Sequence, residues 1–433
     1  MRQPKILTTM RSYSLSLFVA DLLAGLTVAL VALPLSLAIA IASGADPSRG
    51  LVTAIIGGFF ISLLGGSRVQ IGGPTGAFIV VVYGVIADHG YDGLILATFM
   101  AGVILLVAGY FRLGRLVAYV PGAVVNGFTI GIAIVIATSQ IKDFLGLRMD
   151  AVPAEFIPKV RALAGASDSA SLPALLVAMV TLVLIVALRR LAPRWPGLIV
   201  AIIAGSVLAW ALGGSVDTLH SRFGDLPANL PMPMLPQPTF AKVVELLPSA
   251  FVIAFLAGIE SLLSAVVADR MIEGHHRPNA EVTAQGVANI ASAMFGGMPA
   301  TGAIARTATN IRAGGKTPVA GLVHALAIWL MMAAFAPLVG QLALPALAAL
   351  LVMVAWNMSE PHKWRSYLAE RRSDQVLLVL TLVLTVVVDL TIAIGTGVAL
   401  GLALRIEHNR LRPGRWTGLS REDMHSDQDE KQP

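Results

Sequence analysis

The chain has 433 residues, of which 56% are hydrophobic and only 13% are charged, and its mean hydropathy is +0.78. These values exclude an ordinary soluble globular protein and indicate an integral membrane protein. The chain has no cysteine, which excludes disulfides and thiolate metal sites, while its formal net charge of +6 raises the question of a nucleic-acid partner.

Long apolar stretches along the chain predict transmembrane helices. The stretch 21–42 is nearly uncharged and is apolar on all sides, whereas the strands of a membrane barrel would be shorter and would alternate. With about 20 residues needed to cross a bilayer, we expect an all-α protein with fourteen spans, at 19–43, 50–65, 75–87, 93–111, 121–141, 173–189, 196–213, 248–268, 281–296, 301–312, 318–339, 342–356, 375–389 and 392–406.

Some of these segments are too short to cross a membrane alone, notably 75–87 and 301–312. Broken backbone at membrane depth is tolerated only where neighbouring protein buries it. We therefore expect these two segments to be half-helices inside the bundle.

The distribution of positive charge predicts the orientation. Lys and Arg accumulate in short cytoplasmic loops. With the N-terminus inside, the inside segments hold 23 of the 31 basic residues and the outside segments hold seven, mostly in the long loops 142–172 and 214–247. This predicts a multi-pass protein of the cell (inner) membrane with both termini in the cytoplasm, and the basic excess then requires no nucleic-acid partner.

One short phrase occurs twice. GGPTGAFI (72–79) opens the third span, and GGMPATGAI (296–304) opens the tenth, which is the third of a second set of seven. Because seven is odd, the second set crosses the membrane upside down, as in transporters built from inverted repeats. We expect one transmembrane domain at 1–406, with repeats at about 19–189 and 196–406, followed by a polar cytoplasmic tail at 407–433.

The repeated phrase predicts an anion site. Gly and Pro break the helix, so each copy exposes helix N-terminal amides, which carry partial positive charge. Two such ends from inverted halves would face each other near the midplane and bind an anion without a metal or cofactor. We call this pair of facing helix ends the cradle. Its expected substrate-binding residues are Thr75, Gly76, Ala77, Thr301, Gly302 and Ala303.

Three polar residues within spans extend this site. Glu260 lies in the middle of the eighth span, where a carboxylate costs roughly 2.5 to 3.5 kcal/mol on insertion scales, so it is a candidate for binding a coupling ion. Arg306 could hold the anion or pair with Glu260, and the sequence favours neither. Ser264 lies one helical turn after Glu260, which places it on the same face.

Four blocks of the sequence resemble the SulP family of sulfate-permease-type anion transporters: 50–77, 120–134, 260–271 and 296–321. The resemblance implies a core domain of spans one to four and eight to eleven, and a gate domain of the other spans. It also implies that the anion lies between the third and tenth spans. Glu260 matches the acidic residue that bacterial members use for proton or sodium coupling, and Arg306 matches an anion-facing arginine.

The sequence departs from the family pattern at its end. Most members continue into a cytoplasmic STAS domain, whereas this sequence stops after a short polar tail, so we expect no STAS domain. The resemblance also suggests a homodimer formed through the gate.

We expect a transporter with no catalytic residues, which moves a small anion such as bicarbonate, sulfate or a dicarboxylate, with proton-coupled symport by alternating access. Sodium-coupled bicarbonate symport and a nucleobase permease of the same fold stay open, although the tenth span offers no carboxylate to hold a base. An intramembrane hydrolase would need a nucleophile and a base, for which His324 and Ser264 are the best pair, but no motif supports it.

Overall fold

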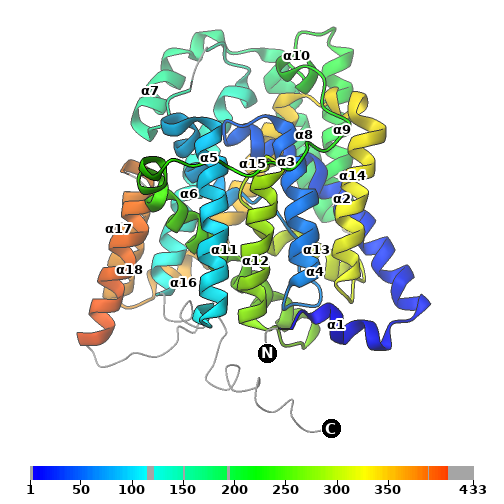
Figure 1. Cartoon of the computed structure of the whole chain (residues 1–433). Helices are drawn as coiled ribbons and strands as arrows, with labels where there is room; N and C mark the ends of the chain where they lie inside the picture. Colours follow the sequence, from blue (N-terminus) through cyan, green and yellow to red (C-terminus); the bar gives the residue numbers. More distant parts are fainter. Residues whose placement is uncertain (1–2, 115–120, 150–151, 193–195, 389, 408–433) are drawn as a thin grey trace.

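The computed structural model describes residues 3–114, 121–149, 152–192, 196–388 and 390–407, and these residues form a helical bundle (Figure 1). The predicted polar tail lies outside the described residues, apart from Glu407 at the end of the last helix. Eight helices in the described part are long and apolar enough to cross a membrane. Their lengths follow from nearly unbroken apolar sequence, since a helix satisfies every backbone group within its own segment inside a bilayer.

The fourteen predicted spans are all found as helical segments. Those up to the long outer loop 214–247 are α2 (Leu15–Ala42), α3, η2 and α4 (Pro47–Val52, Thr53–Gly57 and Gly58–Leu64), η3 and α5 (Gly76–Phe78 and Ile79–Tyr110), α6 (Gly122–Leu145), α8 (Leu172–Leu191) and α9 (Gly197–Ala211). Those after it are α11 (Phe240–Ile272), α12 (Pro278–Met294), α13 (Ile304–Arg312), α14 (Val319–Gly340), α15 (Leu344–Met358), α17 (Arg372–Val387) and α18 (Leu390–Glu407).

The fold is therefore seven plus seven helical spans in inverted repeats. Counted along the chain, α9 is the seventh span, which places it in the first set of seven. The third and fourth spans are joined within α5, which bends at Gly90, where φ is 70°. This left-handed backbone explains why a glycine stands at the turn between the two spans.

Short helices lie at the two ends of the bundle. The helices α7 (Phe156–Gly165) and α10 (Leu219–Phe223) belong to the loops predicted to lie outside, and they cover one end in Figure 1. The first helix, α1 (Lys5–Thr9), and α16 (Trp364–Leu368) lie toward the opposite end. The single-turn segments η1 (Met10–Ser12), η5 (Ser167–Ser169) and η6 (Pro361–Lys363) complete the connections.

The spans pack as two groups, which are the core and gate domains. In the core, α5 packs against α11 and α12, and α14 packs against α2 and α4. In the gate, α6 packs against α15 and α17, and α8 packs against α9 and α15. The groups meet where α2 contacts α15 and α9, and where α5 contacts α6.

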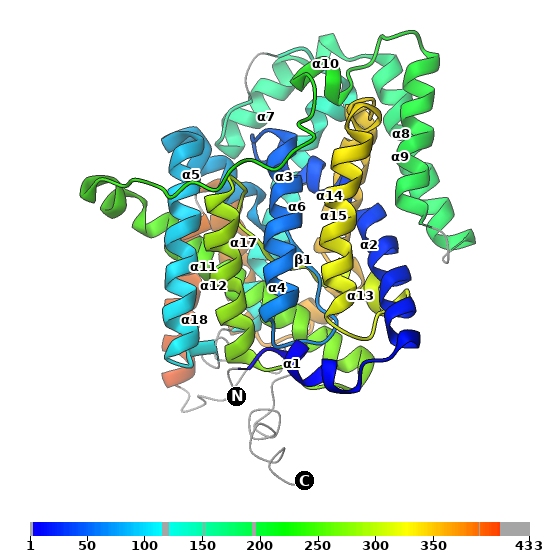
Figure 2. The same cartoon turned by 45° about the vertical axis from the view of Figure 1, so that its right-hand side comes forward.

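Two very short strands lie inside the core. The strands β1 (Gly72–Gly73) and β2 (Thr301–Gly302) pair antiparallel, with Gly72 opposite Gly302 and Gly73 opposite Thr301. They lie just before the helices of the third and tenth spans, and Figure 2 labels β1 beside α4. The two copies of the repeated phrase therefore meet directly, each followed by the start of a helix.

Candidate functional site

The strand pair sets the position of two helix beginnings. After β1 the chain enters η3 and α5, and after β2 it enters α13. A further backbone bond extends the ladder, because the Ala303 amide donates to the Ile71 carbonyl over 2.9 Å. The first amides of a helix have no acceptor within their own helix. Both repeats therefore bring partly positive helix ends to the same place in the core.

The first half of the predicted cradle faces the gate. Thr75 and Ala77 are buried. A Cβ atom added to Gly76 would lie 3.0 Å from the Met358 sulfur and 3.5 Å from the Ile136 side chain. Met358 ends α15 and Ile136 belongs to α6, so this helix start lies at the interface between core and gate.

The second half of the cradle is held within the core. The Thr301 hydroxyl is fully buried and donates to the Ala257 carbonyl over 2.9 Å. A Cβ atom added to Gly302 would lie 1.6 Å from the Gln70 amide nitrogen, so any side chain here would have to displace Gln70, which is buried and bonded to Ser261. Ala303 is buried and precedes the first residue of α13.

Glu260 joins the cradle through a hydrogen bond. The Thr75 hydroxyl donates to the Glu260 carboxylate over 2.6 Å. Glu260 lies on α11, and its side chain is partly exposed. Because Thr75 precedes the first turn of the third span, a change at the carboxylate can reach the helix end that would bind the anion. Within the described residues, no group of three His, Asp or Glu side chains could hold a metal ion.

Arg306 lies behind the strand pair and is only 2% exposed. One terminal nitrogen, Nη2, donates to the Ser36 hydroxyl over 3.1 Å. The other, Nη1, lies 2.2 Å from where a Cβ atom of Gly73 would be, so a side chain there would have to displace the guanidinium, and the φ of +149° at Gly73 also favours glycine. Among the described residues no ion pair joins Arg306 to Glu260, which bonds Thr75 instead. Arg306 is thus a buried positive charge beside the cradle.

Among the described residues, Ser264 makes no hydrogen bond to Glu260. Its hydroxyl lies 3.2 Å from the Thr307 hydroxyl, which in turn accepts the Ile71 amide over 3.1 Å. Ser264 is fully buried. Ser264 therefore contacts a residue that holds the backbone next to β1. Its role in holding a coupling ion stays a prediction.

Glu281 is a buried carboxylate that the sequence analysis did not single out. It accepts the Gly66 amide over 2.8 Å and the Ser261 hydroxyl over 2.9 Å, and it also bonds Gln285. These bonds join the loop after α4 to α11 and α12. Glu281 comes shortly after Pro278 at the start of a helix, where acidic residues are common on the surface, so nothing in the local sequence announces its burial.

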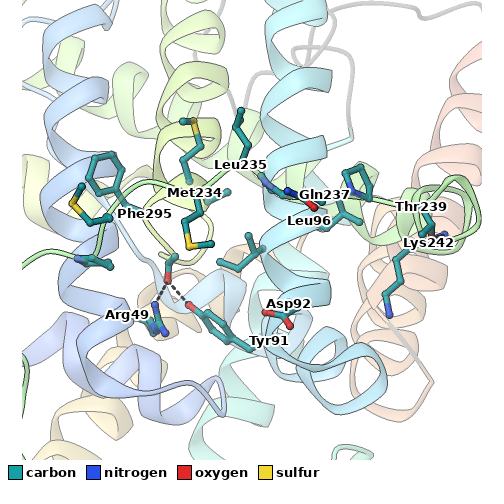
Figure 3. A pocket seen from close by; sticks show the side chains of 18 residues that line it. Arg49, Tyr91, Asp92, Leu96, Met234, Leu235, Gln237, Thr239, Lys242 and Phe295 are labelled. Carbon is teal, nitrogen blue, oxygen red and sulfur yellow. Dashed lines mark hydrogen bonds between the residues drawn. The ribbon is translucent and has the colours of Figure 1, made fainter.

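A separate cavity of about 610 Å³ lies toward the end of the bundle that carries α7 and α10. The segment 231–239 runs over it, and Met234, Leu235 and Phe295 give it apolar walls (Figure 3). Arg49 and Tyr91 both donate to the Gly296 carbonyl, over 3.2 Å and 2.9 Å. These bonds fix the loop that leads into β2.

Lys159 on α7 connects core and gate outside the spans. Its ammonium group donates to the Ser139 hydroxyl on α6 over 3.0 Å and lies 5.0 Å from the centre of the Tyr83 ring on α5. Lys159 is 3% exposed. Burial disfavours the charged form and lowers the pKa of Lys159 from 10.5 to about 8.

Comparisons with known proteins agree with this fold. The model of the sulfate permease family matches residues 18–381. The candidate sulfate transporter YvdB of Bacillus subtilis (strain 168) is 43% identical over 372 residues, which are 86% of this chain and 70% of YvdB. The bicarbonate transporter BicA of Synechocystis sp. is 33% identical over 342 residues, and the match covers 76% of this chain but only 59% of BicA.

A solved structure gives the same result. The transmembrane domain of a cyanobacterium bicarbonate transporter, BicA, superposes with a TM-score of 0.80 at 32% sequence identity. The match covers 88% of this chain and 98% of that domain. The arrangement of helices described above is thus the arrangement of a transporter membrane domain.

Proposed function

The chain belongs to the sulfate permease family, and from this premise we propose that it is a secondary active transporter of a small anion, coupled to protons and working by alternating access. The observation that carries the proposal is the pairing of β1 with β2, which brings the helix ends of both repeats together. Anion transport itself agrees with the relatives, which are named as sulfate and bicarbonate transporters and not as enzymes.

The proposed binding site uses backbone amides. The starts of the third and tenth spans together supply partial positive charge, and Arg306 adds a full charge behind them. Helix N-termini bind anions because their free N–H groups point at the ligand. We propose that the anion lies against the small residues Gly76, Ala77 and Ala303, whose size lets it approach the amides of the two helix ends.

A matched set of variants tests this site. Leucine at Ala77 or Ala303 should fill the space between the helix ends and abolish uptake of anion into proteoliposomes. Ala333→Leu, at an exposed position on α14, is the control for inserting the same side chain. Wild-type uptake and affinity in Ala77→Leu and Ala303→Leu would place the anion elsewhere.

We propose bicarbonate, sulfate or a small dicarboxylate as the substrate. Two measurements will rank these anions. The first is the competition of each anion with the uptake of one labelled anion. The second is thermal stabilisation by each anion, because a ligand that binds only the folded state stabilises it by mass action. The alternative is a nucleobase permease of the same fold, which predicts uptake of uracil or a purine and no competition by anions.

Proton coupling is assigned to Glu260. Its bond to Thr75 connects protonation of the carboxylate to the anion-binding helix end. Glu260→Gln mimics the protonated form, so it should still bind the anion, while its uptake should no longer respond to an imposed pH gradient. Uptake that still follows the pH gradient in this variant would refute the assignment. Wild-type uptake that requires sodium would support the alternative, a sodium-coupled symporter.

Alternating access can be tested with cysteine, since the chain contains none. We expect cysteines at Gly76 and Ala305 to be labelled by impermeant reagents from both sides of the membrane, depending on the substrate gradient. Gly76 faces the gate and Ala305 is exposed, whereas Gly302 is too crowded by Gln70 for a cysteine. Labelling from one side only, under every gradient, would contradict the mechanism.

We propose that the protein lies in the cell (inner) membrane with both termini in the cytoplasm, and the positive charge of the inside loops supports this orientation. Protease protection of tags at the two termini tests this orientation. We also propose a homodimer through the gate, where α17 carries an exposed apolar row of Val376, Val379, Val383 and Val387. In a monomer, bilayer lipid would cover these residues. Crosslinking between Val383→Cys side chains in membranes would support the homodimer, and its absence would support the monomer.

A further inference from the structure

Three buried side chains around β1 have polar atoms for which the described residues offer no hydrogen-bond partner. These atoms are Nε and Nη1 of Arg306, both ring nitrogens of His324, and the Ser62 hydroxyl. Their side chains are nearly or fully buried, with exposures of 2% for Arg306, 0% for His324 and 4% for Ser62. Buried polar groups in proteins nearly always have hydrogen-bond partners. Five such atoms in one region therefore point to a ligand.

The packing of α4 against α14 brings Ser62 and His324 to one interface. A Cβ atom added to Gly321 would lie 2.0 Å from the Ser62 hydroxyl, so Ser62 faces α14 directly. Gly58, one turn before Ser62, faces His324 in the same way, with 3.9 Å between its added Cβ atom and the ring. The face of α4 that carries Ser62 thus meets the face of α14 that carries His324.

The same interface reaches Arg306 through β1. The Cβ atom added to Gly58 would lie 3.0 Å from the Gly72 carbonyl, which places the His324 side of the interface against β1. Arg306 Nη1 lies against the next residue, Gly73. His324 and Arg306 thus flank consecutive residues of the strand that supports the cradle.

The chemistry of the unpartnered atoms selects water as the ligand. A neutral imidazole presents one acceptor nitrogen and one N–H donor, and a hydroxyl can do both, whereas the guanidinium only donates. A fully ionised anion could accept from Arg306 but could not donate to the acceptor nitrogen of His324. Water does both, and buried waters typically make about three hydrogen bonds to such groups.

We propose that His324, Ser62 and Arg306 form a buried water site between α4, α14 and β1, and that His324 is a positioning residue for Arg306. Water held by His324 would satisfy the Arg306 N–H groups that no protein atom reaches. This keeps the guanidinium charged and oriented behind the cradle. The role of His324 in anion binding rests on the proposed function, whereas the water site itself does not.

The water site is tested first without any anion. A cryo-EM map of the wild-type protein in nanodiscs, at a resolution that shows ordered waters elsewhere, should show density within hydrogen-bond distance of both His324 and Arg306. An empty region between these side chains in such a map would overturn the proposal. Because no substrate is added, this result does not depend on what the protein transports.

Variants test the positioning role. His324→Leu removes both ring nitrogens, and we expect the dissociation constant for bicarbonate or sulfate, measured by thermal shift, to rise about tenfold, which corresponds to 1.4 kcal/mol. His324→Gln keeps a donor and an acceptor and should restore most of the affinity. Ser62→Ala should also raise the dissociation constant, and it removes only one hydroxyl group, so it changes the packing of the core less than His324→Leu does.

The control is Thr98→Val, which removes another buried hydroxyl that has no partner, on α5. It should leave the anion affinity unchanged. Wild-type affinity in folded His324→Leu protein, or equal loss in His324→Leu and His324→Gln, would overturn the positioning role. If the wild-type protein binds none of these anions, the proposed function fails while the water density still decides the site.

Discussion

Replacing Lys159 by methionine should stabilise the protein at neutral pH. Lys159 is the buried lysine of α7 that contacts both core and gate. Burial lowers the pKa of its ammonium group from 10.5 to about 8. At pH 7 the lysine is charged in both folded and unfolded protein, so the folded state carries the full cost of burying this charge.

The magnitude follows from the shift. A change from 10.5 to about 8 corresponds to on the order of 3 kcal/mol, at 1.36 kcal/mol for each pH unit. Methionine also loses the bond to Ser139, about 1 kcal/mol, and the contact with the Tyr83 ring, about 0.5 to 1 kcal/mol. The net expectation is that Lys159→Met is more stable than the wild type by about 1 to 2 kcal/mol at pH 7.

The pH dependence provides a sharper test. Because the folded pKa is lower, the unfolded state binds more protons between pH 8 and pH 10.5, and wild-type stability should rise through this window relative to the variant. Thermal unfolding in detergent from pH 7 to pH 10.5 measures the difference. Lys242→Met at the start of α11 is the control. A destabilised Lys159→Met at pH 7, or a difference from the wild type that does not change with pH, would refute the reasoning.

Two further substitutions test the packing of the core. Gly302→Ala places a Cβ atom 1.6 Å from the Gln70 amide nitrogen and forces this buried, hydrogen-bonded side chain to move, so we expect a lower yield of folded protein by size-exclusion chromatography. Gly84→Ala should fold normally, because its added Cβ atom lies within 4 Å of no described atom beyond its own stretch of helix. Asp21→Asn should lower the unfolding temperature by an amount equivalent to about 1 to 3 kcal/mol. The buried Asp21 carboxylate accepts hydrogen bonds from the backbone N–H and from the hydroxyl of Thr317, one at each oxygen. The side chain of asparagine has only one oxygen, so it cannot accept both.

The meeting of the two repeated phrases could be predicted from the sequence. An odd number of spans in each repeat inverts the second copy, so equivalent helix beginnings face each other across the midplane. The pairing of β1 with β2 confirms that the two phrases meet. The strands themselves could not be predicted, because two residues carry no periodicity and their hydrogen bonds join residues more than 200 positions apart.

The partners of individual side chains were harder to predict. Helical spacing places Ser264 and Glu260 on one face, yet their hydroxyl and carboxylate bond different residues, Thr307 and Thr75. A long side chain such as Arg306 can reach several neighbours, and only the packing of α2 against α13 brings it to Ser36. Spacing along one helix determines a direction, while the choice of partner depends on which other helix lies there.

The bonds around the cradle indicate which parts of the protein can move. Besides the strand pair, Ala303 bonds Ile71, Thr307 accepts the Ile71 amide, and Asn310 donates to the Val69 carbonyl over 2.8 Å. These bonds join the two repeats inside the core, and breaking them would leave buried backbone groups unpaired, each costing about 1 to 3 kcal/mol. Among the described residues no hydrogen bond joins Gly76 to the gate, and its nearest gate neighbours, Met358 and Ile136, present apolar side chains. Relative motion is therefore cheaper between core and gate than between the two halves of the cradle, so the anion site should move as one unit with the core.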